Sequence, residues 1–396
     1  MKTMFKALWL IMVLLAIASC KKTKTDVVVT PSENNKLVVI NDISGTTYGI
    51  NAQTGVAAWK AANPGGGGNY IISPAVTSDA VVVTDMSTSK LLSYNTNTGA
   101  LLWSKNYIYS SYYASPVVKN GIAYIANNDR ITGYTINNGA AVKEMMMPNN
   151  YGANSLNLVN DLFITATCGG HLFGISAEGI KQWEYQSNYG CYHNNPAMNK
   201  GIIYILSSGG KLSAVNAATG AEVWSRDESQ YVENASVVYY DGMLFVTGIG
   251  NKAYAFEAYD GDLVHTYTLP DNEYIYYYAA PTIVDGKLYL LTNEATLVAY
   301  DVSNESIAWQ KKLDIAGGRM MGRITIDNRT ESVSALSSVV VANNMLFVTA
   351  GKTLYALTVK GETKWMFTAE DYMYASPVVL SDFNKAYRNG NAGIAQ

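Results

Sequence analysis

The sequence predicts an all-β fold, an eight-bladed β-propeller of four-stranded antiparallel blades. Three observations lead to it. A tryptophan position recurs about every 41 residues, short strands and turns fill each interval, and the two chain ends supply complementary parts of one blade. Repeats of about 40 to 45 residues with four short strands are typical of propeller blades.

The repeated unit is a short alternating strand, a turn ending in glycine, and a tryptophan four residues later, as in NAATGAEVW (216–224). The position recurs at intervals of 40 to 44 residues, except for a last interval of 56, which indicates one insertion. Lys143 and His265 occupy it in two of the eight units. We expect the glycines to adopt positive φ and the tryptophans to pack between blades. The expected blade-docking residues are Trp59, Trp103, Trp183, Trp224, Trp309 and Trp365.

Each unit carries two further strands before its turn. The first is a short run led by Ser/Ala-Pro, such as ASPVVK (114–119), and the second is a β-branched or aromatic run, such as KLYLLT (287–292). Turn signals separate these runs about every ten residues, and helical periodicity is absent beyond the N-terminal signal. This pattern favours an all-β chain.

The two ends of the chain complete one blade. The N-terminal part supplies KLVVIN (36–41) and the strands up to Trp59 but lacks a Pro-led strand, whereas ASPVVL (375–380) is a surplus one at the C-terminus. Pairing the N- and C-terminal strands in one blade closes the ring and removes exposed edges. The sequence therefore predicts a propeller over residues 36–380, followed by a tail over 381–396.

The N-terminus predicts a bacterial lipoprotein. Residues 1–19 combine a charged start, an apolar run too short to cross a hydrocarbon core of ~30 Å, and small residues before Cys20. The ending IASC resembles the lipobox, whose cysteine is acylated, which implies Cys20 as the lipidation site. Residues 20–35 then form a polar tether. We expect attachment to the outer membrane through lipid only, on its periplasmic or surface face.

The composition narrows the class of partner. Charged residues make up 15% of the chain and the net charge is −3, which argues against a nucleic-acid partner. Polarity is carried instead by Asn, Ser, Thr and 30 Tyr.

Over essentially the whole mature chain, the strand, Thr-Gly, Trp and later Ser-Pro-Val-Val pattern resembles the PQQ-type repeat of quinoprotein propellers. A lipoprotein made only of eight such repeats is similar to the propeller subunit of the outer-membrane β-barrel assembly machinery. That resemblance implies a non-catalytic binding or scaffold protein of the cell envelope, with the barrel-assembly complex as partner. The same fold hosts unrelated activities, so a surface lipoprotein that binds a glycan or small ligand is the alternative.

A PQQ-dependent dehydrogenase is the least favoured function. The dehydrogenases of the family are longer and carry an adjacent cysteine pair, a calcium ligand set and a catalytic aspartate. In this mature chain the cysteines besides the anchor are Cys168 and Cys191, which are not adjacent, and no calcium-loop motif occurs. We therefore expect no catalytic residues and no cofactor.

Both of these cysteines lie close in sequence to two histidines, His171 and His193. Cys168 and His171 bracket a turn within one blade, while Cys191 and His193 lie on the crossover to the next blade, and these two loop types share a face. A disulfide between Cys168 and Cys191 is favoured in an oxidising compartment. Free thiols and a metal site stay open, although the Cys and His spacings do not match common zinc modules.

Tyrosines gather in seven of the eight crossovers from the tryptophan strand to the next Pro-led strand. The eighth crossover carries the insertion, residues 313–336, with arginines on a Gly-flanked loop. Tyr and Arg are typical of recognition surfaces, but the tyrosines could instead only seal the top of the blades. The candidate binding face comprises Tyr109, Tyr112, Tyr113, Tyr192, Tyr276, Tyr277, Tyr278, Tyr374, Arg319 and Arg323.

Overall fold

The computed structural model describes residues 35–64, 72–85, 88–107, 114–127, 129–148, 152–153, 155–159, 161–167, 169–187, 196–207, 209–228, 236–248, 250–270, 273, 275, 280–315, 321–326, 329–334, 337–382 and 385–387. They belong to one compact unit that begins at Asn34. Within these ranges, no helix combines the length and the apolar character needed to span a membrane. Residues 1–19 and Cys20 lie outside them.

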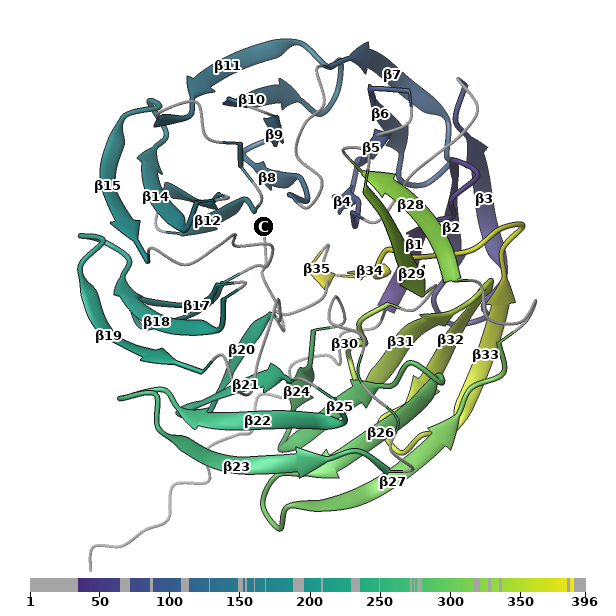
Figure 1. Cartoon of the computed structure of the whole chain (residues 1–396). Helices are drawn as coiled ribbons and strands as arrows, with labels where there is room; N and C mark the ends of the chain where they lie inside the picture. The colour runs from purple at the N-terminus through teal and green to yellow at the C-terminus, as the bar shows by residue number, and fades with distance from the viewer. Residues whose placement is uncertain are drawn as a thin grey trace, which may run out of the picture. The chain divides into compact units, whose positions relative to one another are not determined.

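Eight antiparallel blades surround one axis, which confirms the predicted propeller (Figure 1). In seven of them the chain runs from the inner to the outer strand in sequence order. Blades 2 to 4 are β4 (Ala75–Val76), β5 (Ala80–Asp85), β6 (Lys90–Asn95), β7 (Leu101–Asn106); β8 (Val117–Lys119), β9 (Ile122–Asn127), β10 (Arg130–Thr135), β11 (Ala141–Met146); and β12 (Asn157–Val159), β13 (Leu162–Ala166), β14 (His171–Ser176), β15 (Lys181–Gln186). Blades 5 and 6 are β16 (Ala197–Asn199), β17 (Ile202–Leu206), β18 (Lys211–Asn216), β19 (Glu222–Asp227); and β20 (Val237–Tyr240), β21 (Met243–Thr247), β22 (Lys252–Glu257), β23 (Leu263–Thr268). Blades 7 and 8 are β24 (Thr282–Val284), β25 (Lys287–Leu291), β26 (Thr296–Asp301), β27 (Ser306–Lys312); and β30 (Val340–Ala342), β31 (Met345–Ala350), β32 (Thr353–Thr358), β33 (Thr363–Thr368).

Blade 1 joins the two ends of the chain, as the sequence predicts. Its strands from the outside inward are β3 (Ala57–Ala62), β2 (Thr46–Asn51), β1 (Asn35–Asn41) and β34 (Val378–Ser381). Figure 1 shows the purple N-terminal strands beside yellow β34, and β1 pairs antiparallel with β34. A fifth strand, β35 (Ala386–Tyr387), pairs with the inner edge of β34, so this sheet continues past residue 380.

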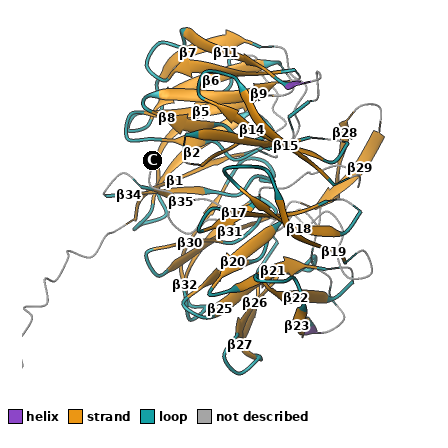
Figure 2. Ribbon diagram, turned by 90° about the vertical axis from the view of Figure 1, so that its left-hand side faces the viewer, coloured by secondary structure: helices purple, strands orange, loops and turns teal. Residues whose placement is uncertain are grey.

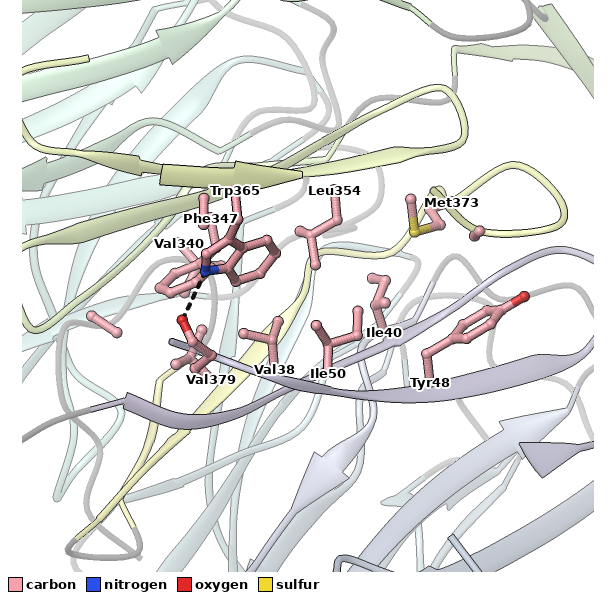
Figure 3. Close-up of a cluster of buried hydrophobic side chains, with 14 of the residues drawn as sticks. Val38, Ile40, Tyr48, Ile50, Val340, Phe347, Leu354, Trp365, Met373 and Val379 are labelled. Atoms are coloured by element: carbon pink, nitrogen blue, oxygen red, sulfur yellow. Dashed lines mark hydrogen bonds between the residues drawn. The ribbon is translucent and has the colours of Figure 1, made fainter. Parts of the chain in front are cut away.

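The core lies between the blades. Because successive strand residues point to opposite faces, Val38 and Ile40 of β1 pack toward blade 8, and Leu37 and Val39 pack toward blade 2. Figure 3 shows the blade 8 side, where β1 and β2 side chains meet Trp365 and its surroundings. Both faces of every central strand are buried in this way, so apolar residues fill these strands with little alternation.

The insertion between β27 and β30 is a β-hairpin, which corrects the expected Gly-flanked loop. Strands β28 (Met321–Ile326) and β29 (Arg329–Ser334) pair antiparallel over their full lengths. They form a separate two-stranded sheet, which Figure 2 shows apart from the four-stranded blades. The β-branched residues of RITI and of RTESV suit paired strands, but these runs are too short to be distinguished from a loop in sequence.

Candidate functional site

The candidate face is formed by the crossovers, each of which runs from the outer strand of one blade to the inner strand of the next. Since the blades share one strand order, the crossovers share one face of the ring. Two residues of the candidate set lie within the described chain. The structure describes the side chain of Tyr374 and the backbone of Arg323, which pairs with Ser332 in the hairpin. The candidates that lie outside the described residues are Tyr109, Tyr112, Tyr113, Tyr192, Tyr276, Tyr277, Tyr278 and Arg319.

The crossover from blade 8 to blade 1, residues 369–377, is described throughout and is folded into the ring. Its backbone bonds to both flanking blades: the Ile43 N–H donates to the Tyr372 carbonyl at 2.9 Å, and the Met373 N–H donates to Gly351 at 3.1 Å. The Lys352 ammonium group lies 5.0 Å from the centre of the Tyr372 ring. This segment therefore bridges blades 8 and 1.

The tyrosines of this crossover are buried. Tyr372 is 7% exposed and Tyr374 is 8% exposed. The structure therefore removes Tyr374 from the candidate face, because a side chain buried inside the propeller offers little surface to a partner. Tyr107, at the start of the crossover from blade 2, is also buried, and burial together with the nearby Asp85 carboxylate raises the pKa of its hydroxyl. At these positions the tyrosine side chains pack inside the propeller.

A partly buried carboxylate anchors the crossover from blade 6 to blade 7. Glu273 accepts hydrogen bonds from the hydroxyls of Thr292 and Thr296, the latter at 3.1 Å, and from the Lys312 ammonium group at 3.3 Å. Burial opposes ionisation, but these donors outweigh it and hold the pKa of Glu273 below its usual value. Two residues later, Ile275 is buried and bridges to Thr292. Glu273 could not be predicted from its own segment, because its partners Thr292, Thr296 and Lys312 lie in blade 7.

The six tryptophans dock onto the following blade. Each indole N–H donates to a backbone carbonyl in the turn after the third strand of that blade. The N···O distances are 2.8 Å for Trp59 to Thr96, 2.8 Å for Trp103 to Ile136, 3.0 Å for Trp183 to Ala217, 3.1 Å for Trp224 to Ala258, 3.0 Å for Trp309 to Val359 and 2.9 Å for Trp365 to Ala52 (Figure 3).

Each of these indole rings also covers the turn glycine of the following blade. At Gly261, for example, φ is +83° and a Cβ would lie 2.6 Å from Cζ3 of Trp224. The glycine thus meets two requirements, a left-handed backbone and room for the ring. The pairs are Gly55 with Trp365, Gly99 with Trp59, Gly139 with Trp103, Gly220 with Trp183, Gly261 with Trp224 and Gly361 with Trp309.

Two interfaces lack this contact. Between blades 6 and 7, His265 occupies the tryptophan position and Glu305 the glycine position, and His265 Nδ1 lies 3.1 Å from Glu305 Oε2. Both members of the pair are therefore replaced at the same interface. Between blades 3 and 4, Lys143 occupies the tryptophan position, and Met145 lies over Gly179 instead.

Serines at the start of the inner strands link neighbouring blades. The Ala280 N–H donates to Ser338 Oγ at 2.8 Å, and the Ser338 N–H donates to Ser376 Oγ at 3.2 Å. On the other side, Ser73 Oγ donates to the Ser376 carbonyl at 2.9 Å. The Ser/Ala-Pro leader of the repeat thus joins blades 7, 8, 1 and 2 near the axis.

The expected Cys/His cluster is represented in the described chain by His171. Its Nδ1 lies 2.8 Å from Glu184 Oε1, and Lys181 donates to the other oxygen of that carboxylate at 2.8 Å. Across the described ranges, no three His, Cys, Asp or Glu side chains gather as a metal site would require. Cys168, Cys191 and His193 lie outside those ranges, so the disulfide stays a prediction.

Comparison with known proteins places this architecture in a family. A family model described as "Outer membrane protein assembly factor BamB" matches residues 17–179, 169–333 and 208–369. The BamB proteins of Francisella tularensis subsp. tularensis and Yersinia pestis are 23% identical over 212 residues and 21% identical over 337 residues. The alignments cover 48% and 81% of this chain, and 46% and 69% of those curated relatives.

The fold is also shared with a solved structure of that name. The crystal structure of BamB from Moraxella catarrhalis has a TM-score of 0.57 at 14% identity, covering 80% of this chain and 93% of that one. At this identity the likeness shows the fold alone. The family model, however, matches well over half of the sequence, and with its PQQ-type repeats in a closed ring of eight blades the chain belongs to the BamB family of outer membrane protein assembly factors.

Proposed function

We propose that this protein is a non-catalytic, lipid-anchored propeller that binds a protein partner in the bacterial envelope and takes part in outer-membrane protein assembly. The observation that carries the proposal is the match of the assembly-factor family model along the blades, from residue 17 to residue 369. This role is the one that the names of the family and of its relatives state.

The use of the repeat residues supports a binding role over catalysis. The tryptophan rings pack against the turn glycines across the blade interfaces. The inner serines link blades, and the Glu273 carboxylate holds a crossover in place. These groups stabilise the propeller, so we expect the partner to contact other residues, on the crossover face.

The parts assigned to partner binding are the β28–β29 hairpin and the remaining tyrosines of the candidate face, Tyr109, Tyr112, Tyr113, Tyr192, Tyr276, Tyr277 and Tyr278. The hairpin pairs with no blade strand in the described structure, and an exposed sheet edge is a common site for the addition of a peptide strand. Cys20 is assigned to lipid attachment, which would hold the ring at the membrane surface.

Crosslinking in native membranes, followed by purification of this protein, tests the role. We expect the barrel-assembly proteins to be enriched with the wild-type chain and to be lost with a chain in which a flexible linker replaces residues 316–336. A Cys20→Ser chain should leave the membrane fraction and serves as the control for the anchor. Saturable carbohydrate binding that disappears with Tyr276→Ala and Tyr277→Ala, without any enrichment of assembly proteins, would overturn the proposal in favour of a glycan-binding lipoprotein.

A further inference from the structure

One buried cross-strand pair in blade 1 is polar on both strands, whereas the corresponding pair in blade 6, Thr247 with Ala253, is polar on one strand only. It is the cross-strand pair next to the turn between the second and third strands, on the side that packs against the following blade. In three blades this pair is apolar: Ala166 with Leu172 in blade 4, Leu206 with Leu212 in blade 5 and Leu291 with Leu297 in blade 7. In blade 1 it is Asn41 with Thr47.

The polar atoms of this pair are buried without a partner. Asn41 is 0% exposed and Thr47 is 1% exposed. Neither the amide nitrogen nor the amide oxygen of Asn41, nor the hydroxyl of Thr47, has a hydrogen-bond partner among the described residues. The neighbouring turn does not use Asn41, because Asp42 accepts the N–H groups of Ser44 at 3.1 Å and of Thr46 at 3.0 Å.

These side chains point into the interface with blade 2. Thr47 pairs with both Asn41 and Ala61, and Ala61 belongs to the apolar cluster shared by blades 1 and 2. At the same end of the interface, Asn63 donates its N–H to the Gly45 carbonyl at 3.0 Å. The side-chain amide of Asn63 donates to Asp85 of blade 2. The buried Asp85 carboxylate and the Asn63 side chain therefore lie at this end of the interface.

A third side chain in this interface has an unpartnered hydroxyl. Tyr94 of β6 belongs to the same cluster, is almost fully buried, and its Oη has no partner among the described residues. Burial, followed by the Asp85 charge, raises the pKa of Tyr94 to about 12. A tyrosine hydroxyl is protonated at neutral pH, so Tyr94 Oη can donate a hydrogen bond as well as accept one.

The chemistry of these atoms selects the ligand. The Asn41 amide nitrogen is a donor that needs an acceptor, the amide oxygen needs a donor, and the hydroxyls of Thr47 and Tyr94 can act as either. A metal cation could bind the oxygens but could not accept from the amide N–H groups. Water both donates and accepts, and buried waters commonly make about three bonds to such groups.

We propose that blades 1 and 2 enclose a buried hydration site in which ordered water binds the Asn41 amide and the Thr47 hydroxyl, in the interface that also buries Asp85 and Tyr94. The site lies at the interface beside the ring-closing blade and is independent of the proposed envelope function. The apolar pairs of blades 4, 5 and 7 have no side-chain donor or acceptor that could bind water in this way.

A crystal structure of the wild-type protein at a resolution that shows ordered solvent tests the site directly. We expect at least one water within about 3.2 Å of an Asn41 amide atom and of Thr47 Oγ1. Direct hydrogen bonds from both side chains to protein atoms, with no solvent between the blades, would overturn the proposal. So would a cation held by oxygens at about 2.3 to 2.6 Å.

Magnetic relaxation dispersion of water ¹⁷O, which counts long-lived internal waters, gives an independent test in solution. The variant Asn41→Leu with Thr47→Val restores an apolar pair like that of blade 5 and should lose at least one long-lived water. Leu212→Val, at the position in blade 5 that corresponds to Thr47, is the matched control and should lose none. An unchanged count in the double variant would contradict the proposed site.

Discussion

At the scale of single residues, the repeat motif joins two interfaces. The glycine and tryptophan of NAATGAEVW lie four residues apart, yet each packs against a residue of another blade. Gly220 lies under Trp183 of the preceding blade, and Trp224 covers Gly261 of the following blade. Positive φ at these glycines could be predicted from turn chemistry. The close approach of the indole could not, because the partner belongs to another unit.

This arrangement predicts different outcomes for alanine at two glycines of blade 6. Gly261 and Gly242 have nearly the same φ, +83° and +84°, but a Cβ at Gly242 meets no atom within 4 Å. Gly242→Ala should lower the free energy of unfolding by about 1–2 kcal/mol, through backbone strain alone. Gly261→Ala should lower it by a further ~1–3 kcal/mol, because Trp224 must shift. Equal losses in chemical denaturation would show that the indole contact does not matter.

At the scale of elements, the ring and its closure could be predicted because they depend on local patterns, such as the surplus strand at 375–380. The burial of the crossover tyrosines could not. Tyr372 is covered through contacts with Ile43 and Lys352, which come from blades on either side of it. Nothing near Tyr372 in sequence distinguishes a buried tyrosine side chain from one that faces a partner. The Asn41 and Thr47 pair could not be predicted either, since a polar residue at a strand end is ordinary in sequence.

The interface between blades 6 and 7 offers a test of the docking rule. His265→Trp alone would bring an indole against Glu305, whereas Glu305→Gly supplies the turn that the other blades use. Ala255, opposite His265 on β22, is as small as the residues opposite Trp224 and Trp365. The Val302 carbonyl corresponds in position to the other indole acceptors. We expect the combined variant to exceed the sum of the single changes by about 1–3 kcal/mol in unfolding free energy.

A double-mutant cycle of thermal or denaturant unfolding measures that coupling. Val264→Trp, which places the same ring at the exposed neighbouring position, is the control and should show no coupling with Glu305→Gly. A coupling near zero for the His265 pair would mean that the Trp and Gly positions act independently, contrary to the contacts seen at the other six interfaces.

At the scale of the whole molecule, closure of the ring depends on one short strand. The side chains of Val378, Val379 and Leu380 in β34 are at most 1% exposed, and they join the clusters on both sides of blade 1. At about 1.5–3 kcal/mol each, their burial is comparable to a typical total stability of ~5–15 kcal/mol. A chain ending at Tyr374 should therefore fail to fold cooperatively or should aggregate through the open edge of β1. A chain ending at Asp382 keeps β34, loses only β35, and should still unfold in one transition. Adding a peptide of residues 375–387 to the shorter chain should restore that transition in calorimetry, whereas a shorter chain that melts like the full-length protein without the peptide would show that the ring closes without β34.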